Sequence, residues 1–336
     1  MTNQPPPPPN AELIGPAVKA AAMMAAGNLG LFKLLAEGPR STAEIAGILG
    51  ANEPGVALLA EALASVGYLE RVDNRYGNGP VPRAWLTPAS PVDFTPLLLW
   101  APLGWHLMED LHQVVRRGGP DRPLYEYLQE QPELGRANAE YMKAMAQLTA
   151  GSIAQAVPVP DTATRLLDLG GSHGSYSIAF CKRHPRLEAV VYDLPVAVAG
   201  TGEAIAAEGL AGRMSVQHGN YLADDIGEGY DVILCFLLNH NHTEDDNKRL
   251  AAKIGKALNP GGMVVVHEFL RGDPPDAFNA LYSLLFFMYS AGRNYSYQEI
   301  TGWLADAGLS GFNRVDLPPR GQSSLITAIK ASSFQR

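Results

Sequence analysis

The sequence predicts a chain of two parts: a mostly helical amino-terminal part, and an α/β part with a parallel sheet covered by helices on both faces. At 336 residues, the chain exceeds the length of one ordinary domain. Up to about residue 158, apolar residues recur at helical spacing. From residue 159 on, short apolar runs alternate with stretches of helix length, which is typical of strand–helix–strand units. We therefore expect a ligand site at the carboxyl ends of the strands.

The amino-terminal part divides into a tail and a small domain. Residues 1–10, "MTNQPPPPPN", are too rich in proline to pack and predict a disordered tail. Residues 11–92 begin with a helix pair interrupted near Gly27 to Gly30. A helix capped by Ser41 or Thr42 follows, then a second helix and two short strands within "YLERVDNRYGN". Helix, turn, helix and two strands are the order of a winged helix.

A winged helix raises the question of DNA binding. The second helix of the pair, predicted over residues 55–67, contains neither Lys nor Arg, and the whole chain carries a formal net charge of -8. Binding to a polyanion depends on clustered basic side chains, so we expect no nucleic-acid partner. The apolar residues of this winged-helix domain exceed what one small domain can bury, which favours dimerisation. A winged-helix regulator that senses a small molecule is the non-enzymatic alternative.

Composition limits the other classes. A composition of 46% hydrophobic and 18% charged residues is typical of an ordinary globular protein. Cys181 and Cys235 have no metal-ligand or redox spacing and predict buried, reduced thiols. The amino terminus lacks a basic segment followed by an apolar one, and no apolar run reaches the roughly 18 residues of a membrane span. We expect a cytoplasmic protein without a membrane partner.

Residues 93–158 predict a helical connecting region that contributes to a substrate pocket. Aromatic and methionine side chains suit a flat, largely apolar ligand, and plain helix core is the alternative for each of them. With two residues from later in the chain, the predicted pocket set is Trp100, Met142, Met145, His242 and Phe287.

The stretch "LLDLGGSHGSYS" carries the strongest local signal. An apolar strand ends in Asp168, and Gly170, Gly171 and Gly174 follow before an amphipathic helix. Glycines there allow close approach of a ligand to backbone N–H groups at the start of a helix. The spacing is not the dinucleotide fingerprint G-x-G-x-x-G.

A second strand ends in Asp193 and Leu194 and is followed by a helix expected near residues 196–208. The third strand is followed by Asn220 and Tyr221. A carboxylate after the second strand can accept both hydroxyls of a ribose, and the third strand end can hold an adenine. An adenosine-containing cofactor is therefore predicted. A helix cap is the alternative role for Asp193.

Histidines end the next two strands. The fourth strand leads directly to His240, and His242 follows at the same rim. A neutral imidazole can accept a proton from a phenol or enol, which makes His240 a candidate general base. His267 and Glu268 close the fifth strand, where one of the pair can orient that base. A solvated loop position is the alternative for His242.

From about residue 12, these motifs resemble the S-adenosylmethionine-dependent O-methyltransferases of the plant caffeic acid and bacterial polyketide type. "LGLFKLLAEGPRSTAEIAGILG" resembles the dimerisation winged helix, and "LLDLGGSHGSYS", "VVYDLPVAV" and "GLAGRMSVQHGNYL" resemble the cofactor segments. The resemblance implies a Rossmann-like class I methyltransferase domain over residues 159–333, S-adenosylmethionine as cofactor and a homodimer formed through the amino-terminal domain.

The resemblance also implies site roles. His240 matches the family's general base and Glu268 the acidic residue beside it, while Asn294 stands where the family has a second glutamate. Asn239 and His242 replace apolar and tryptophan positions of the family, which implies a more polar pocket. The function implied is O-methylation of a small aromatic or polyketide-like hydroxyl in secondary metabolism. The alternatives are C-methylation of a 2-oxo acid or other enolisable substrate, with a metal on His240 and His242, and a family member repurposed for other chemistry.

Overall fold

A computed structural model describes residues 10–317 and 323–332 of the chain. Two compact units are present, residues 1–105 and residues 106–336. The tail predicted over residues 1–10 lies outside the described residues except for Asn10, which begins the first helix. The domain boundaries predicted after residues 92 and 158 stay predictions.

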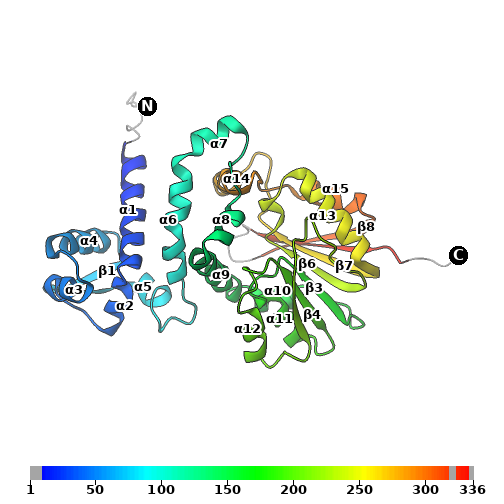
Figure 1. The fold of residues 1–336 in the computed structure, drawn as a ribbon, viewed down its shortest axis with the longest axis horizontal. Coiled ribbons are helices and arrows are strands. Elements are labelled where there is room, and N and C mark those ends of the chain that lie inside the picture. Colours follow the sequence, from blue (N-terminus) through cyan, green and yellow to red (C-terminus); the bar gives the residue numbers. More distant parts are fainter. Residues whose placement is uncertain (1–9, 318–322, 333–336) are drawn as a thin grey trace, which may run out of the picture. The chain divides into compact units, whose positions relative to one another are not determined.

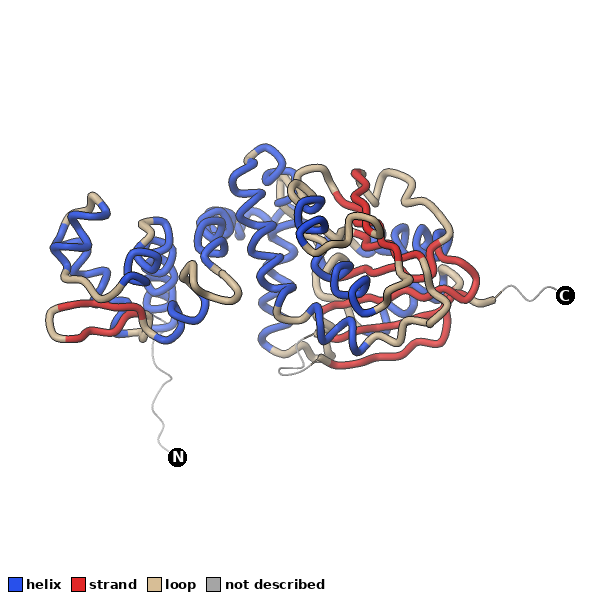
Figure 2. Tube along the Cα trace, turned by 90° about the horizontal axis from the view of Figure 1, so that it is seen from below, coloured by secondary structure: helices blue, strands red, loops and turns tan. Residues whose placement is uncertain are grey.

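The first unit contains the predicted helix, turn, helix and two-stranded hairpin (Figure 2). Gly30, in the left-handed conformation with φ of 74°, separates the first two helices. The elements are α1 (Asn10–Asn28), α2 (Leu31–Leu34), η1 (Leu35–Glu37), α3 (Thr42–Leu49), α4 (Glu53–Ser65), β1 (Leu69–Val72), β2 (Arg75–Asn78) and α5 (Pro80–Trp85).

The start of α3 is set by Ser41. Its hydroxyl accepts a hydrogen bond from the backbone N–H of Glu44, and the Glu44 carboxylate accepts one from the backbone N–H of Ser41. This capping box satisfies two donors that the first turn of a helix leaves unpaired. The Glu44 carboxylate also pairs with Arg75 at 2.6 Å, which ties α3 to β2.

Helix α6 (Thr95–Glu109) leads into the second unit, in which a seven-stranded sheet is flanked by helices (Figure 1). Its helices are α7 (Leu111–Arg117), α8 (Leu124–Glu130), α9 (Pro132–Gln147), α10 (Ala150–Ala156), α11 (Ser175–Arg183), α12 (Thr201–Ala207), η2 (Asn239–Asn241), α13 (Glu244–Ala257), α14 (Ala277–Ser290) and α15 (Tyr297–Asp306). Its strands are β3 (Arg165–Leu169), β4 (Glu188–Asp193), β5 (Met214–His218), β6 (Tyr230–Phe236), β7 (Leu258–Glu268), β8 (Leu309–Asp316) and β9 (Ser324–Lys330).

The strand order is β5-β4-β3-β6-β7-β9-β8, so the direction of winding reverses between β3 and β6. Strands β3 to β7 pair in parallel, whereas β9 is antiparallel to both β7 and β8. The wholly parallel sheet predicted from the sequence is therefore corrected at this edge, because β8 and β9 follow one another with a short connection. A reversal of this kind opens a crevice at the carboxyl ends of the strands that flank it.

Alternate residues of each strand enter two hydrophobic cores, one on each face of the sheet. In β3, Leu166 packs on the face covered by α10, α11 and α12, and Leu167 packs on the face covered by α13 and α15 (Figure 1). Cys181 and Cys235 are free and buried, as predicted.

One helix is shorter than expected. The sequence predicted a helix over residues 196–208, but α12 begins only at Thr201. Gly200 adopts a left-handed conformation, with φ of 90°, and residues 195–200 form turns instead. The segment that follows Asp193 is therefore a loop at the rim of the sheet.

Candidate active site

A cavity of about 370 Å³ lies at the carboxyl ends of β3 to β6, at the crevice expected from the strand order. Helices α8 and α9 contribute its apolar lining. Ten of the residues predicted for cofactor or substrate line it: Met142, Met145, Asp168, Gly170, Gly171, Asp193, Leu194, Asn220, Tyr221 and His242. The fold therefore brings together residues that lie up to 100 positions apart in the sequence.

Two glycines after β3 pack so closely against neighbouring side chains that no other residue fits at their positions. A Cβ atom on Gly170, which has φ of 68°, would lie 2.5 Å from the side chain of Leu238. One on Gly171 would lie 2.6 Å from the carboxyl carbon of Asp168. Gly174 is the N-cap of α11 and has no side chain to cap it, while the first backbone N–H of the helix, that of Ser175, donates to His173 Nδ1 at 3.1 Å. The loop thus presents backbone donors to a ligand, which suits an anionic or polar group.

Asp168 and Asp193 are both buried carboxyl groups of this cavity. Asp168 accepts a hydrogen bond from the Ser177 hydroxyl, and burial raises the pKa of Asp168 to about 6. Asp193 accepts the Ser172 N–H at 3.0 Å on one oxygen and the Leu194 N–H at 2.7 Å on the other. Burial also raises the pKa of Asp193 to about 6. No helix begins at Asp193, so its alternative role as a helix cap has no support.

The loop after β5 is fixed by its own polar groups and by α13. The Asn220 side-chain oxygen accepts the Leu222 N–H, and the Asn220 N–H donates to the Asp224 carboxylate. The ammonium group of Lys253 donates at 2.8 Å to each of three carbonyl oxygens, those of Tyr221, Leu222 and Asp224. These contacts hold the Asn220 and Tyr221 segment against the cavity.

His240 lies in η2, directly after β6, and is buried together with Glu268 at the end of β7. The His240 Nδ1 and the Glu268 Oε2 are 2.7 Å apart. A carboxylate only accepts, so Nδ1 carries the proton and Nε2 keeps a lone pair. The ring of Phe286 stacks on the imidazole at 3.8 Å, with an interplanar angle of 22°. The ring's tautomer and its plane are therefore both fixed.

His267 and Glu268 point to opposite faces of β7, so only Glu268 reaches His240. The His267 ring lies edge-on to Phe236 and Tyr176, and neither of its nitrogens has a hydrogen-bond partner among the described residues. Burial lowers the pKa of His267 to about 4, which keeps the ring neutral. Of the two residues that the sequence offered as orienting groups, Glu268 has the geometry.

Asn294 is fully buried and faces Asn279. Its amide nitrogen donates at 3.0 Å to the Asn279 side-chain oxygen, and within the described part of the chain its own side-chain oxygen has no partner. The nearby Gly292 lies so close to η2 that a Cβ atom there would be 2.1 Å from the His240 carbonyl oxygen. The segment of Asn294 therefore supports the backbone of the histidine turn.

His242 faces Tyr221, with its Nε2 2.8 Å from the phenol oxygen. Burial lowers the pKa of His242 to about 4. The rings of His240 and His242 thus have separate partners, and no group of three metal-ligating side chains occurs among the residues that the structure describes. The His240 and His242 metal site of the alternative mechanism gains no support from this geometry.

The remaining predicted pocket residues lie elsewhere. Trp100 is buried in α6, in the first unit. Phe287 does not line the cavity; its neighbour Phe286 packs on His240 instead. Sequence reasoning also missed Tyr125 of α8 and His173 of the glycine loop, which both line the cavity. Burial raises the pKa of the Tyr125 phenol to about 12, and an aromatic residue in "PLYEYL" was the only signal for it.

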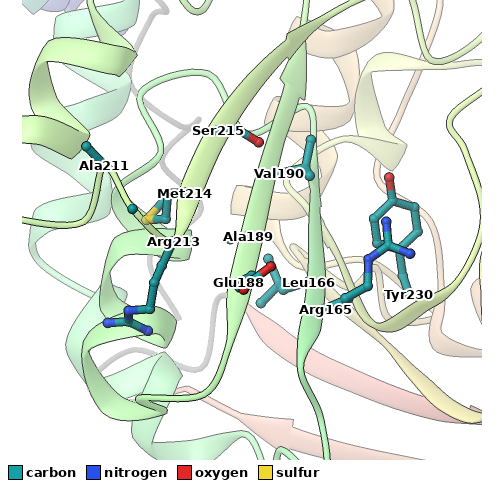
Figure 3. Close-up of a pocket in the computed structure, with 11 residues that line it drawn as sticks. Arg165, Leu166, Glu188, Ala189, Val190, Ala211, Arg213, Met214, Ser215 and Tyr230 are labelled. Carbon is teal, nitrogen blue, oxygen red and sulfur yellow. The ribbon is translucent and has the colours of Figure 1, made fainter.

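A second hollow of about 270 Å³ lies at the opposite edge of the sheet, at the amino ends of β3, β4 and β5 (Figure 3). Arg165 stacks on Tyr230 and donates to the carbonyl oxygens of Glu228 and Gly229. Arg213 donates to three carbonyl oxygens around the end of α11. Both guanidinium groups are thus occupied by backbone, and the chemistry of the site lies at the carboxyl edge.

Comparison with known proteins agrees with this geometry. Residues 104–310 match the model of the O-methyltransferase domain, and residues 11–88 match that of the O-methyltransferase dimerisation domain. The chain belongs to the O-methyltransferase family. This O-methyltransferase is 32% identical over 324 residues to 3-hydroxy-5-methyl-1-naphthoate 3-O-methyltransferase of Streptomyces sahachiroi, covering 93% of this chain and 92% of the relative.

Two further relatives extend the comparison. Mitomycin biosynthesis 6-O-methyltransferase of Streptomyces lavendulae is 28% identical over 89% of this chain and 87% of its own length. The solved structure of the mitomycin 7-O-methyltransferase superposes with a TM-score of 0.86 at 26% identity, covering 95% of this chain and 96% of that one. The O-methyltransferase described here is an S-adenosylmethionine-dependent enzyme with a Rossmann-like domain and a dimerisation domain.

The cavity residues of this O-methyltransferase fit that cofactor. Asp193 has used two of its acceptor positions on backbone N–H groups and keeps others for a pair of hydroxyls. Gly170 and Gly171 line the cavity, so the wall at this point is backbone. Among the described residues, no single helix combines the length and apolar character needed to cross a bilayer, although one bent pair, residues 12–28 and 31–37, passes on length and composition alone.

Proposed function

We propose that the enzyme methylates the hydroxyl group of a small aromatic or polyketide-like acceptor, with His240 as the general base. When bound, S-adenosylmethionine supplies an activated methyl group, so the protein has to position the acceptor and remove a proton. The observation that carries the proposal is the buried hydrogen bond of 2.7 Å between His240 Nδ1 and Glu268. It leaves Nε2 as the basic atom.

In this proposal, the imidazole Nε2 takes the proton of the acceptor hydroxyl, whose oxygen would receive the methyl group as the sulfur–methyl bond breaks and S-adenosylhomocysteine leaves. Glu268 holds the Nδ1 proton and stabilises the imidazolium ion that forms, because the pair is shielded from water. Phe286 keeps the ring plane fixed. On the cofactor side, the glycine loop, Asp193 and the Asn220 segment bind the amino-acid, ribose and adenine portions in that order along the sheet edge.

The acceptor class rests on the lining and on the relatives. Met142, Met145 and Tyr125 provide flat and deformable apolar surface beside the polar cofactor segments. The relatives named above are an O-methyltransferase of a hydroxynaphthoate and enzymes of mitomycin biosynthesis. We propose a hydroxylated aromatic acceptor, and a cytoplasmic homodimer formed through residues 11–88 as the working form.

The test replaces the base. His240→Ala is expected to abolish methyl transfer to a panel of hydroxynaphthoates and phenols, measured as release of S-adenosylhomocysteine. The same variant should bind S-adenosylhomocysteine in calorimetry within about threefold of the wild type, because the segments assigned to the cofactor follow β3, β4 and β5, whereas His240 follows β6. Full activity in the variant, or equal loss of turnover and cofactor binding, would contradict the assignment of His240 as the base.

A further inference from the structure

Two buried asparagines hold the turn that carries His240. Asn239 directly precedes His240 in η2, and Asn247 lies in the first turn of α13. The Asn239 Nδ2 donates a hydrogen bond of 2.8 Å to the Asn247 Oδ1. The two residues are 6% and 1% exposed, and neither lines the cavity. The proposed mechanism gives neither side chain a role.

Asn247 also binds the backbone of the turn. Its Nδ2 donates to the carbonyl oxygen of Asn239 at 2.9 Å and to that of His242 at 3.4 Å. An amide nitrogen carries two hydrogens, so both bonds form at once. The two carbonyl groups stand on either side of His240 and Asn241 in the chain. One side chain therefore binds the turn at both ends.

The turn depends on support from its neighbours. Leu237, where the chain leaves β6, has φ of 53°, in the left-handed region that residues with a side chain rarely adopt. A residue in such a conformation stays there only when its surroundings fix it. The Asn241 side chain donates to the Leu237 carbonyl oxygen at 3.2 Å, and η2 itself is a single turn of three residues. The position of this segment is thus set by side chains.

The position of the turn decides how His240 meets Glu268. The carboxylate accepts the ring Nδ1–H at 2.7 Å and the backbone N–H of His240 at 3.4 Å. The second of these bonds is already long. A small displacement of the turn would therefore break it and tilt the ring away from the carboxylate. The contacts of Asn247 act on the imidazole through this backbone.

We propose that Asn247, paired with Asn239, is a positioning residue that keeps the His240 ring on Glu268 and its Nε2 directed at the acceptor. The inference rests on the proposed role of His240 as the base. A purely structural role for Asn247 predicts a loss of stability alone. A positioning role predicts a loss of turnover as well, with unchanged binding of the ligands.

Three variants separate these roles. Asn247→Ala removes its three hydrogen bonds to the turn. The double variant Asn239→Leu with Asn247→Ala removes them too, but it leaves no unpaired amide behind, which gives a second route to a folded protein. The matched control is Asn259→Ala, because Asn259 lies at the amino end of β7 and donates at 2.8 Å to Asp231. Thermal melts verify that each variant is folded.

The first readout is turnover of the hydroxynaphthoate or phenol that the wild type methylates fastest. Both variants of Asn247 should lower kcat by about 10- to 100-fold, the cost of a misplaced reacting group. The KM and the Kd for S-adenosylhomocysteine should stay within about threefold. Asn259→Ala should lower the melting temperature and keep kcat within about twofold.

The second readout needs no acceptor. The proton on His240 Nδ1 is held in a short, buried hydrogen bond and should give a sharp downfield resonance in proton NMR. Its absence from His240→Ala assigns it. We expect the resonance to persist in Asn259→Ala and to broaden or vanish in both variants of Asn247.

Other outcomes overturn the inference. A folded variant of Asn247 with wild-type kcat would reduce the pair to a source of stability. A lowered kcat with an unchanged Nδ1 resonance would mean that Asn247 does not act through His240, and an equal loss of kcat in Asn259→Ala would make the effect a general one. Full activity of His240→Ala would instead refute the proposed function, whereas failure of the inference alone leaves His240→Ala inactive.

Discussion

We expect the buried carboxyl group of Asp193, the proposed ribose ligand, to make cofactor affinity depend on pH. An ionised carboxylate has about four acceptor positions, and in Asp193 the N–H groups of Ser172 and Leu194 use two of them. Two positions remain for the two ribose hydroxyls. A protonated carboxyl loses one of these positions and places a donor where a hydroxyl must donate.

The magnitude follows from the shifted pKa. Because the pKa of Asp193 is raised to about 6, the group is ionised at pH 7.5 and about nine-tenths protonated at pH 5. If only the ionised form binds, the apparent Kd rises by the inverse of the ionised fraction, about tenfold over this interval or about 1.4 kcal/mol. Affinity is thus present above the raised pKa and lost as pH falls through it.

The assay is calorimetric titration with S-adenosylhomocysteine at intervals from pH 5 to pH 8. The wild type should weaken about tenfold toward pH 5, whereas Asp193→Asn should bind weakly at every pH with little slope. Asp168, whose pKa is also raised to about 6, is the matched control, since Asp168→Asn should keep the wild-type slope. A flat wild-type profile, or a slope that persists in Asp193→Asn and disappears in Asp168→Asn, would refute the reasoning.

Three further predictions concern other parts of the molecule. Glu268→Gln should lower kcat by about 10- to 100-fold with unchanged affinity for S-adenosylhomocysteine, because a charged hydrogen bond to His240 becomes a neutral one; a kcat near that of the wild type would remove Glu268 from the mechanism. His267→Leu should raise the melting temperature by removing two buried, unpaired nitrogens, and a lower one would show that His267 has a partner. Ser41→Ala should destabilise the chain to urea by about 1 kcal/mol through loss of the cap on α3, with Ser65→Ala, whose hydroxyl bonds only its own helix, as the control; equal midpoints for the two variants would contradict the capping role.

The local pattern of apolar runs followed by polar residues was enough to predict the site residues at strand ends. Asp168, Asp193 and His240 each follow an apolar run, and parallel strands bring their carboxyl ends to one edge of the sheet. The glycine loop was equally visible, since close approach to the backbone requires small residues. These features follow from the order of the strands along the chain and from the alternation of side chains in a strand. Both can be recognised in a single sequence.

Helix packing was harder to predict. Phe287 was expected in the pocket, but it is Phe286, about 100° around the same helix, that meets His240. Asn239, expected to make the pocket more polar, pairs with Asn247 of α13 on the other side of η2. The rotation of a helix about its axis is set by its neighbours, so apolar content alone does not decide which side chain faces a ligand.

The reversal of strand order also divides the catalytic domain along the sequence. In the proposed mechanism, residues 166–222 supply the glycine loop, the ribose carboxylate and the adenine loop, whereas residues 236–294 supply the base, its carboxylate and the stacked phenylalanine. The two stretches meet at the β3–β6 boundary and again where Tyr221 faces His242. Because Tyr125, Met142 and Met145 of the proposed acceptor lining belong to neither stretch, acceptor preference can diverge through changes in α8 and α9 while the cofactor and base segments stay intact.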